Sequence, residues 1–200
     1  MEIFKYGPKE LDYLKKKDKK LAAAIDRIGM IERRVIPDLF TALVHSIVSQ
    51  QISSKAAETV WNRMRERLGA ITPETIGNAA AEDIQKFGLS MRKANYIKGI
   101  SEAAIRGRLK LTELKELSDS KIIEHLSSLN GIGVWTAEML LVFSMERPDV
   151  VSWGDLAIRR GMMRLYGLET LSKEQFERYR KRYSPYGSVA SLYLWALSAE

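Results

Sequence analysis

The sequence contains no cysteine among its 200 residues. Disulfides, iron–sulfur clusters, cysteine-bound zinc and thiol nucleophiles are therefore excluded. It has only two histidines, His45 and His125, so a histidine-rich metal site is excluded as well. We expect His45 to be a core residue of an apolar helix and His125 to lie on a helix face.

Long apolar runs are also missing. A membrane-spanning helix needs about 20 consecutive apolar residues, and the longest run, around Met139–Ser144, is far shorter. The first residues, Met1–Lys5, lack the apolar segment of a secretory signal. These absences predict an intracellular protein without membrane contact, located in the cytoplasm or nucleoid, or in the nucleus if the source is a eukaryote.

The sequence has an excess of positive charge. Lysine and arginine number 32 against 25 aspartates and glutamates, which leaves a net charge of +7. Residues 1–34 carry ten positive and six negative charges, and residues 159–182 carry eight and three. The basic excess is thus concentrated in two stretches, and it favours an anionic partner.

Helix signals recur along the whole chain, as polar caps followed by apolar residues at spacings of three and four. They predict helices from Pro8, from Asp18 to near Gly29, over Leu39–Val48, from Ser53 or Ser54 to Gly69, from Pro73, over Glu82–Phe87, Ser90–Arg106, Ser118–Leu129 and Val134–Met145, and after Asp155, Ser172 and Pro185. Residues 33–36 and 149–152 are β-prone but too short to build a sheet. The sequence therefore predicts an all-α fold of roughly ten or more helices.

Two glycines separate two of these helices, in the run Leu129-Asn130-Gly131-Ile132-Gly133. Glycines two positions apart allow a tight turn and let several N–H groups face one anion. In a basic protein, phosphate is the natural ligand. A plain helix–turn–helix corner with a glycine cap fits the same residues, so the glycines alone leave both interpretations open.

The residues around this turn carry a resemblance. The run continues Val134-Trp135-Thr136-Ala137-Glu138-Met139, and Asp155 follows Trp135 by twenty positions in Trp153-Gly154-Asp155-Leu156. This pattern resembles the helix–hairpin–helix DNA glycosylase superfamily, and within it the 3-methyladenine DNA glycosylase II branch. Residues 47–53, 87–94 and 183–195 are also similar to segments of that branch, so the resemblance spans about residues 18–198.

The resemblance implies one domain over residues 1–200 with two helical lobes flanking a cleft. One lobe would comprise about residues 30–110, and the other about residues 111–200 plus the amino-terminal helices. The resemblance further implies a minimal helix–hairpin–helix glycosylase fold, without the amino-terminal β-domain that some family members have.

The family's catalytic aspartate corresponds to Asp155. Breaking an N-glycosidic bond builds positive charge on the sugar, which a carboxylate stabilises. Without the resemblance, an aspartate before an apolar helix is commonly a simple helix cap. Trp135 stands where bifunctional relatives carry a lysine that forms an imine with the sugar. Because tryptophan cannot form an imine, the resemblance implies a monofunctional enzyme that leaves an abasic site.

Aromatic side chains are expected to hold the damaged base. An N3- or N7-alkylated purine is cationic, and electron-rich ring faces attract it by stacking and cation–π interaction. Trp135 and Trp195 are the main pocket candidates, with Trp153 a weaker one, and Met139 replaces an aromatic residue of some relatives. The alternative is that the tryptophans are core residues, as is usual for this residue type.

The remaining DNA contacts come from two loops. Gln50, Gln51, Ile52 and Ser53 match the loop that wedges into the duplex, and we expect Gln51 to fill the gap left by the extruded nucleotide. The phosphate-binding hairpin would comprise Gly131, Ile132, Gly133, Val134 and Thr136. The carbonyls of Ser127, Leu129 and Ile132 match those that hold a monovalent cation, Na⁺ or K⁺, in relatives. No other cofactor is expected.

The expected function is base excision repair. A monomeric DNA glycosylase would flip alkylated purines, 3-methyladenine and also 7-methylguanine, out of double-stranded DNA and hydrolyse the glycosidic bond. One alternative is a non-catalytic helix–hairpin–helix DNA-binding protein, but such a protein has no need of a carboxylate near phosphates, as Asp155 would be. The other alternative is a glycosylase for deaminated bases such as hypoxanthine.

Overall fold

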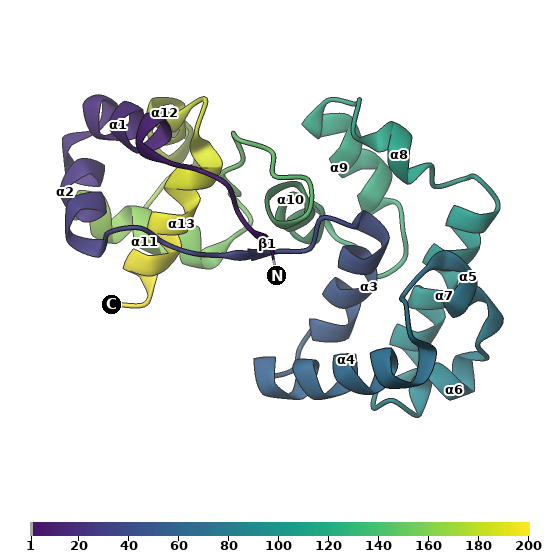
Figure 1. Cartoon of the computed structure of the whole chain (residues 1–200). Helices are drawn as coiled ribbons and strands as arrows, with labels where there is room; N and C mark the ends of the chain where they lie inside the picture. Colours follow the sequence, from purple (N-terminus) through teal and green to yellow (C-terminus); the bar gives the residue numbers. More distant parts are fainter. Residues whose placement is uncertain (1) are drawn as a thin grey trace. The chain divides into compact units, whose positions relative to one another are not determined.

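The computed structural model describes residues 2–200 and confirms the all-α prediction (Figure 1). Its elements are β1 (Glu2–Ile3), α1 (Pro8–Lys17), α2 (Lys19–Ile28), β2 (Arg34–Val35), α3 (Leu39–Ser49), α4 (Ser54–Leu68), α5 (Pro73–Asn78), α6 (Ala81–Gln85), α7 (Met91–Ile105), α8 (Leu111–Leu114), α9 (Asp119–Ser127), α10 (Val134–Phe143), α11 (Leu156–Tyr166), α12 (Lys173–Tyr183) and α13 (Gly187–Ser198). No helix within residues 2–200 is long and apolar enough to cross a membrane.

The helices begin where their cap residues predict. The side chains of Asp18, Asp38, Ser53, Ser90 and Ser172 each accept a backbone N–H of the following first turn. Such caps satisfy amides that have no partner inside the helix. Because this chemistry involves residues within four positions of each other, the sequence alone locates these helix starts.

Of the two short β-prone segments, only one differs from the expectation that neither builds a sheet. Residues 33–36, expected to be too short for a sheet, contain β2, which pairs antiparallel with β1 at the amino terminus. Residues 149–152 form no strand, because side chains of α13 take the backbone groups of Val150. Its N–H donates to the Ser188 hydroxyl (3.0 Å), and its carbonyl accepts from the Ser191 hydroxyl (2.9 Å).

The chain forms two compact units. Of the described residues, 2–35 and 141–200 form unit 1, and 36–140 form unit 2. The division differs from the expected boundary near residue 110, since residues 111–140, with the glycine turn, belong to unit 2. The reason is visible in the contacts of Gly131, whose carbonyl accepts a hydrogen bond from the Gln50 side chain and whose Cα lies against Tyr96.

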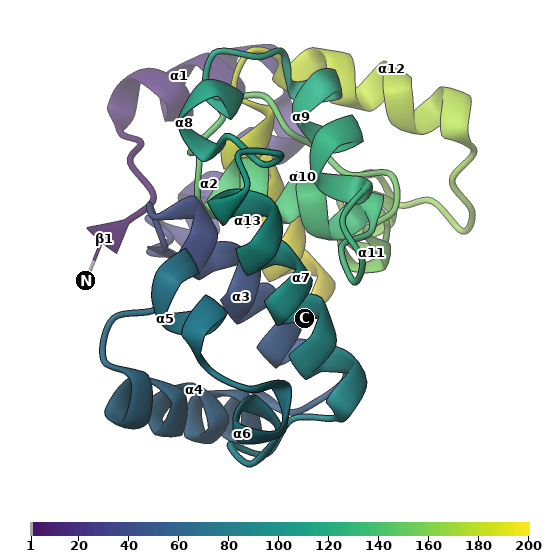
Figure 2. The same ribbon diagram turned by 90° about the vertical axis from the view of Figure 1, so that its right-hand side faces the viewer.

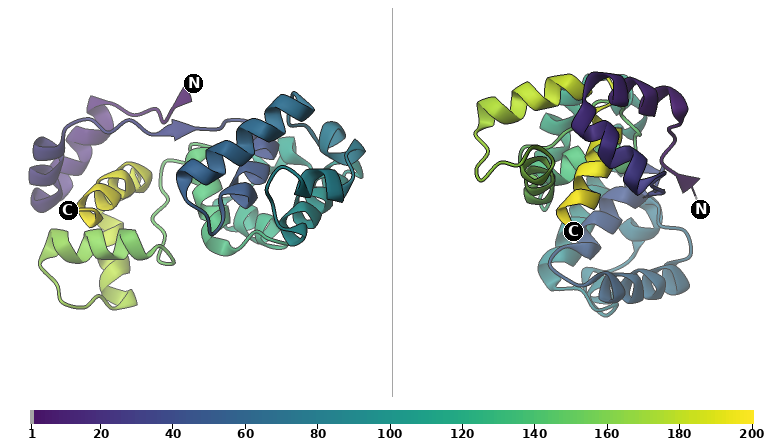
Figure 3. Two further views of the ribbon diagram at one scale, coloured as in Figure 1. Left: turned by 90° about the horizontal axis from the view of Figure 1, so that it is seen from below. Right: turned by 90° about the vertical axis from the view of Figure 1, so that its left-hand side faces the viewer.

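Unit 1 is organised around the buried helix α13. It packs against α11, α2, α1 and α12, so the amino-terminal helices and the carboxy-terminal helices share one core (Figures 1 and 3). Gly161 of α11 lies directly against the backbone carbonyl of Leu194 in α13, leaving no room for a Cβ atom. The close approach of these two helices fixes the start of α11 beside the end of α13, where the candidate site is formed.

Unit 2 is organised around α3 and α7 (Figure 2). Helix α3 packs against α4 and α7, and α7 packs against α5 and α6. His45 of α3 is half-buried with its ring edge-to-face to Trp61, at 4.9 Å between centroids and 84° between planes. Burial lowers the pKa of His45, which fits a packing role. His125 is exposed on α9, as expected for a helix-face residue.

Candidate active site

The predicted catalytic carboxylate, Asp155, is buried at the amino-terminal end of α11, with 6% of its surface exposed. Its Oδ1 accepts the backbone N–H of Ile158 (2.9 Å), and its Oδ2 accepts the indole N–H of Trp195 (3.1 Å). Oδ1 therefore caps the helix, as the alternative interpretation predicts, but a helix cap does not explain the hydrogen bond to Oδ2. Two N–H donors and a helix amino terminus complement a negative charge at this point.

Trp195 of α13 is half-buried, and its ring lies 5.4 Å from that of Phe143, tilted by 32°. The sequence predicts a base-stacking role for this tryptophan. The structure adds that its N–H is committed to Asp155, which fixes the plane of the indole relative to the carboxylate. No sequence signal indicates this contact, because the two residues are forty positions apart on different helices.

Trp153 has a different environment from the one expected. Its ring packs edge-to-face against the buried Phe176, at 5.1 Å and 72°, and the Arg159 guanidinium lies over it at 4.9 Å. Because Arg159 lies over the ring and Phe176 of α12 packs against it, Trp153 has a packing role in unit 1. These contacts account for Trp153 without a base, and its place in the base pocket stays a prediction.

Trp135 and Met139 lie on α10 in the part of that helix that belongs to unit 2. Met139 is half-buried, whereas Trp135 is 49% exposed. A tryptophan with this exposure is not a core residue, so the packing alternative is excluded for Trp135. Large exposed aromatic rings of this kind are typical of binding surfaces.

The glycine turn joins α9 to α10, and its two glycines have different roles. Gly131 has a φ of +89°, which side chains of L residues rarely adopt, and a Cβ atom here would lie 2.5 Å from Cδ2 of Tyr96. Gly133 has open space where its Cβ atom would be, and it is exposed. Gly131 therefore makes the turn, and Gly133 leaves the approach to the helix start open.

The predicted phosphate-binding residues surround this helix start. Ile132 is buried and closes the turn by donating its N–H to Leu129 (3.1 Å), while Val134 is 56% exposed and Thr136 is half-buried. The first amides of a helix have no intrahelical acceptor. At α10 the first such bond is made by Ala137, whose N–H donates to the Gly133 carbonyl (2.9 Å). The start of α10 is thus built like an anion site.

The predicted wedge loop contacts the glycine turn directly. Nε2 of Gln50 donates to the Gly131 carbonyl (2.7 Å), so Gln50 anchors the loop and does not project from it. Gln51 is exposed with a φ of +57°, a conformation that is uncommon outside glycine. Ile52 is 40% exposed, and the Ser53 hydroxyl accepts the N–H of Ala56. Gln51 and Ile52 therefore form the projecting tip.

Lys93 of α7 is a site residue that sequence reasoning missed. Its Nζ donates to the carbonyls of Val48 (3.0 Å) and Gln50 (2.6 Å), and burial lowers its pKa. Helix α3 has no basic residue in its last turn and no glycine at its end. Its final carbonyls therefore need a donor from elsewhere, which is the signal that points to a distant lysine. Lys93 fixes the end of α3 and thereby the start of the wedge loop.

The carbonyls proposed for a cation lie around the end of α9. The carboxyl end of a helix carries partial negative charge, and the Leu129 carbonyl, which accepts the Ile132 N–H, keeps a second lone pair. Ser127 is the last residue of α9. These oxygens have the hard-donor chemistry that Na⁺ and K⁺ require. Within residues 2–200 there is no group of three or more His, Asp or Glu side chains suited to a metal ion.

Comparisons with known proteins identify a family and several similar proteins. The family model described as HhH-GPD superfamily base excision DNA repair protein matches residues 44–185. DNA-3-methyladenine glycosylase 1 of Schizosaccharomyces pombe is 37% identical over 164 residues, covering 80% of this chain and 72% of that protein.

Two solved structures are similar over nearly the whole chain. The crystal structure of a DNA-3-methyladenine glycosidase from Bacillus halodurans superposes with a TM-score of 0.86 at 36% identity, covering 99% of this chain and 93% of that one. A 3-methyladenine DNA glycosylase of Schizosaccharomyces pombe, in complex with abasic DNA, gives a TM-score of 0.79 at 32% identity, covering 94% and 95%.

Proposed function

The chain belongs to the HhH-GPD superfamily of base excision DNA repair proteins, and we propose that Asp155 is the carboxylate with which it removes alkylated purines from DNA. It is a DNA glycosylase of the 3-methyladenine type, and the resemblance seen in the sequence is confirmed. The observation that carries the role of Asp155 is its burial at the start of α11 with both oxygens held by N–H donors. A protein that only bound DNA would use the helix cap that Oδ1 makes, but it would not need a second donor that holds Oδ2.

The reaction replaces a carbon–nitrogen bond with a carbon–oxygen bond. The bond between C1′ of the sugar and the ring nitrogen breaks, and its electron pair leaves with the purine. Positive charge then develops on the sugar, and the Asp155 carboxylate stabilises it. A water oxygen bonds to C1′, the water loses a proton, and the strand keeps an abasic site. A cationic 3-methylated purine leaves as a neutral base, so little acid catalysis is needed.

Trp195 is a positioning residue for this step. Its indole N–H fixes Oδ2 of Asp155, while the Ile158 amide fixes Oδ1, so the carboxylate cannot rotate away from the sugar. A hydrogen bond to a charged group contributes about 1.5–3 kcal/mol. Trp195 also remains the aromatic candidate in unit 1 for stacking on the base.

Trp195→Phe is therefore expected to lower the single-turnover rate of 3-methyladenine release by about 10-fold or more, because it removes the N–H donor and keeps an aromatic ring. Affinity for DNA containing an abasic-site analogue should change little. Trp153→Phe is the matched control, since that ring packs on Phe176 and Arg159, and its excision rate should equal the wild-type rate. A wild-type rate for Trp195→Phe would contradict the positioning role.

Release of free base without strand cleavage is the second expected result, because Trp135 replaces the imine-forming lysine. The assay uses duplexes that each contain one 3-methyladenine, 7-methylguanine, hypoxanthine or 8-oxoguanine. Free base is measured by chromatography, and abasic sites by alkaline cleavage. We expect release of 3-methyladenine, intact strands before alkali, and no covalent adduct after borohydride treatment. Efficient borohydride trapping, or excision confined to hypoxanthine, would overturn this assignment.

The residues that we expect to contact DNA around the damaged base lie in unit 2. We propose that the first amides of α10, with Gly133 as the open approach, bind a backbone phosphate, and that Gln51 or Ile52 fills the space left by the extruded nucleotide. The oxygens of Ser127, Leu129 and Ile132 would hold a monovalent cation beside that phosphate and supply positive charge there. We also propose that the protein acts as a monomer.

A further inference from the structure

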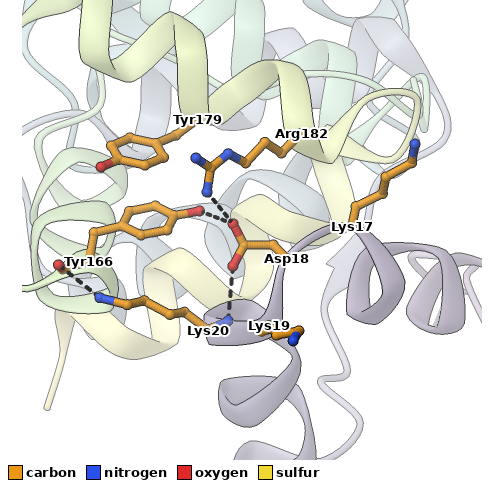
Figure 4. Close-up of a pocket in the computed structure, with 7 residues that line it drawn as sticks. All are labelled: Lys17, Asp18, Lys19, Lys20, Tyr166, Tyr179 and Arg182. Carbon is orange, nitrogen blue, oxygen red and sulfur yellow. Dashed lines mark hydrogen bonds and ion pairs between the residues drawn. The ribbon is translucent and has the colours of Figure 1, made fainter.

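A basic pocket lies in unit 1 at the opposite end of α11 from Asp155. It has a volume of about 340 Å³. Its lining consists of four cationic side chains, one carboxylate and two tyrosines: Lys17, Lys19, Lys20, Arg182, Asp18, Tyr166 and Tyr179 (Figure 4). These residues come from the end of α1, the start of α2, the end of α11 and α12. The two stretches of the sequence in which basic residues are concentrated therefore meet here.

Asp18 forms the buried floor of this pocket, and its acceptor capacity is taken. Oδ1 accepts the backbone N–H groups of Lys20 and Leu21 (3.0 Å each), and Oδ2 accepts Tyr166 Oη (2.6 Å) and Arg182 Nη1 (3.1 Å). Burial alone would raise the pKa of Asp18, but these hydrogen bonds outweigh burial and lower it. The amides at the start of α2 are thus occupied by Asp18, so any ligand must be bound by the side chains.

Two stacked tyrosine rings form the wall of the pocket. The rings of Tyr166 and Tyr179 stack at 3.7 Å between centroids and 11° between planes. The Arg182 guanidinium lies over both rings, at 5.7 Å and 5.0 Å, and Lys20 Nζ donates to the Tyr166 carbonyl (3.1 Å). Arg182 and Lys20 therefore stay near the pocket, although Arg182 keeps 44% of its side chain exposed.

Lys17 and Lys19 complete the pocket from the outside. Both are exposed, and their ammonium groups extend from the adjoining ends of α1 and α2 (Figure 4). The lining thus holds one carboxylate, paired with Arg182, against four cations, which leaves an excess of positive charge. Lysines on flexible stems around an open pocket match the phosphates of an extended backbone, which they bind without reading sequence.

This pocket is distinct from the active site within unit 1. Asp155 precedes the first turn of α11 and Tyr166 is its last residue. A rise of 1.5 Å per residue places them about 16 Å apart along the helix axis. The phosphates that reach Lys17 and Lys19 are therefore not those that flank the base held at Asp155.

We propose that the pocket around Lys17, Lys19 and Arg182 binds the phosphodiester backbone of duplex DNA outside the segment that carries the damaged base. The inference rests on the proposed function, because it assumes that duplex DNA is the substrate. A second contact of this kind holds the enzyme on undamaged DNA while it searches, since affinity of this electrostatic kind is independent of sequence.

The test is Lys17→Gln/Lys19→Gln in the full chain. Glutamine keeps the helix propensity of lysine and removes its charge. The matched control is Lys86→Gln/Lys110→Gln, which removes the same net charge from two exposed lysines of unit 2, each paired with a nearby carboxylate. Each variant is measured for binding to an undamaged 200-base-pair duplex over a series of salt concentrations, and for single-turnover excision from a short duplex that contains 3-methyladenine.

Lys17→Gln/Lys19→Gln should weaken binding to the long duplex by about 3-fold or more at low salt. It should also reduce the slope of log affinity against log salt concentration by about 1.8, because each of the two lost phosphate contacts contributes about 0.9. Excision from the short duplex should stay within about 2-fold of wild type, and the control should bind the long duplex like wild type. Unchanged binding overturns the proposal, as does an equal loss in the control.

The proposal is also overturned if Lys17→Gln/Lys19→Gln loses as much excision activity on the short duplex as it loses affinity for the long duplex. The phosphates that contact Lys17 and Lys19 would then belong to the catalytic complex. Failure of the wild-type protein to excise any base would instead count against the proposed function. A competition experiment with inorganic pyrophosphate tests whether the pocket is instead a site for a small free anion. We expect pyrophosphate to displace the long duplex neither from wild type nor from Lys17→Gln/Lys19→Gln. Displacement from wild type at micromolar pyrophosphate would indicate such a site and contradict the proposal.

Discussion

Asp155→Asn is expected to lower single-turnover release of 3-methyladenine from duplex DNA by about 100-fold or more, because it removes one well-placed electrostatic stabiliser of the transition state. The variant keeps the shape of the side chain, and its Oδ1 can still accept the Ile158 amide. Affinity for abasic-analogue DNA should be unchanged or higher, since a negative charge near phosphates is lost. Excision at the wild-type rate would remove Asp155 from the mechanism.

The structure also identifies the confounding effect of this substitution and a way to separate it. The new Nδ2 group would face the Trp195 N–H, so that two donors meet where the wild type has a hydrogen bond, at a cost of about 1–3 kcal/mol. The double variant Asp155→Asn/Trp195→Phe removes this conflict. Its melting temperature should be higher than that of Asp155→Asn alone, while excision stays low. Recovery of excision in the double variant would show that the single variant lost activity through local distortion.

The sequence predicts the parts of this protein whose physics is local. Asp18 and Asp38 are recognisable as caps because each bonds to an amide within three positions along the chain. Asp155 and the glycine turn are found by their spacing along the chain, which resembles that of the family. What these features share is that a short stretch of chain contains both partners of the interaction.

The contacts that assemble the site were not predictable in this way. Trp195 reaches Asp155 across forty positions, and Gln50 reaches Gly131 across eighty-one. Both depend on how helices pack, which in unit 1 is set by the contact of Gly161 with Leu194. A tryptophan, a glutamine and a glycine in a helical pattern have many other common environments. Their roles therefore become visible only in the three-dimensional structure, as did the packing role of Trp153.

A contact that only the three-dimensional structure reveals also decides how the glycine turn should be tested. On the sequence alone, Gly131→Val is the natural variant for this test, with an expected affinity loss of about 10-fold, or roughly 1.4 kcal/mol. In the structure, however, Gly131 has a positive φ and lies against Tyr96, so any side chain there disturbs the turn itself. Loss of DNA binding by this variant would not separate a phosphate site from a structural corner.

Gly133→Val separates the two, because Gly133 has open space around its missing Cβ atom and no positive φ. If the first amides of α10 bind a backbone phosphate, a side chain here obstructs its approach and should weaken binding to abasic-analogue DNA by about 10-fold in every sequence context. The melting temperature should stay near that of wild type. Gly99→Ala is the control, since Gly99 is exposed in α7 with open space around it. It should bind DNA normally and gain stability of about 0.5–1 kcal/mol. Wild-type affinity in a stable Gly133→Val protein would show that the turn only connects two helices.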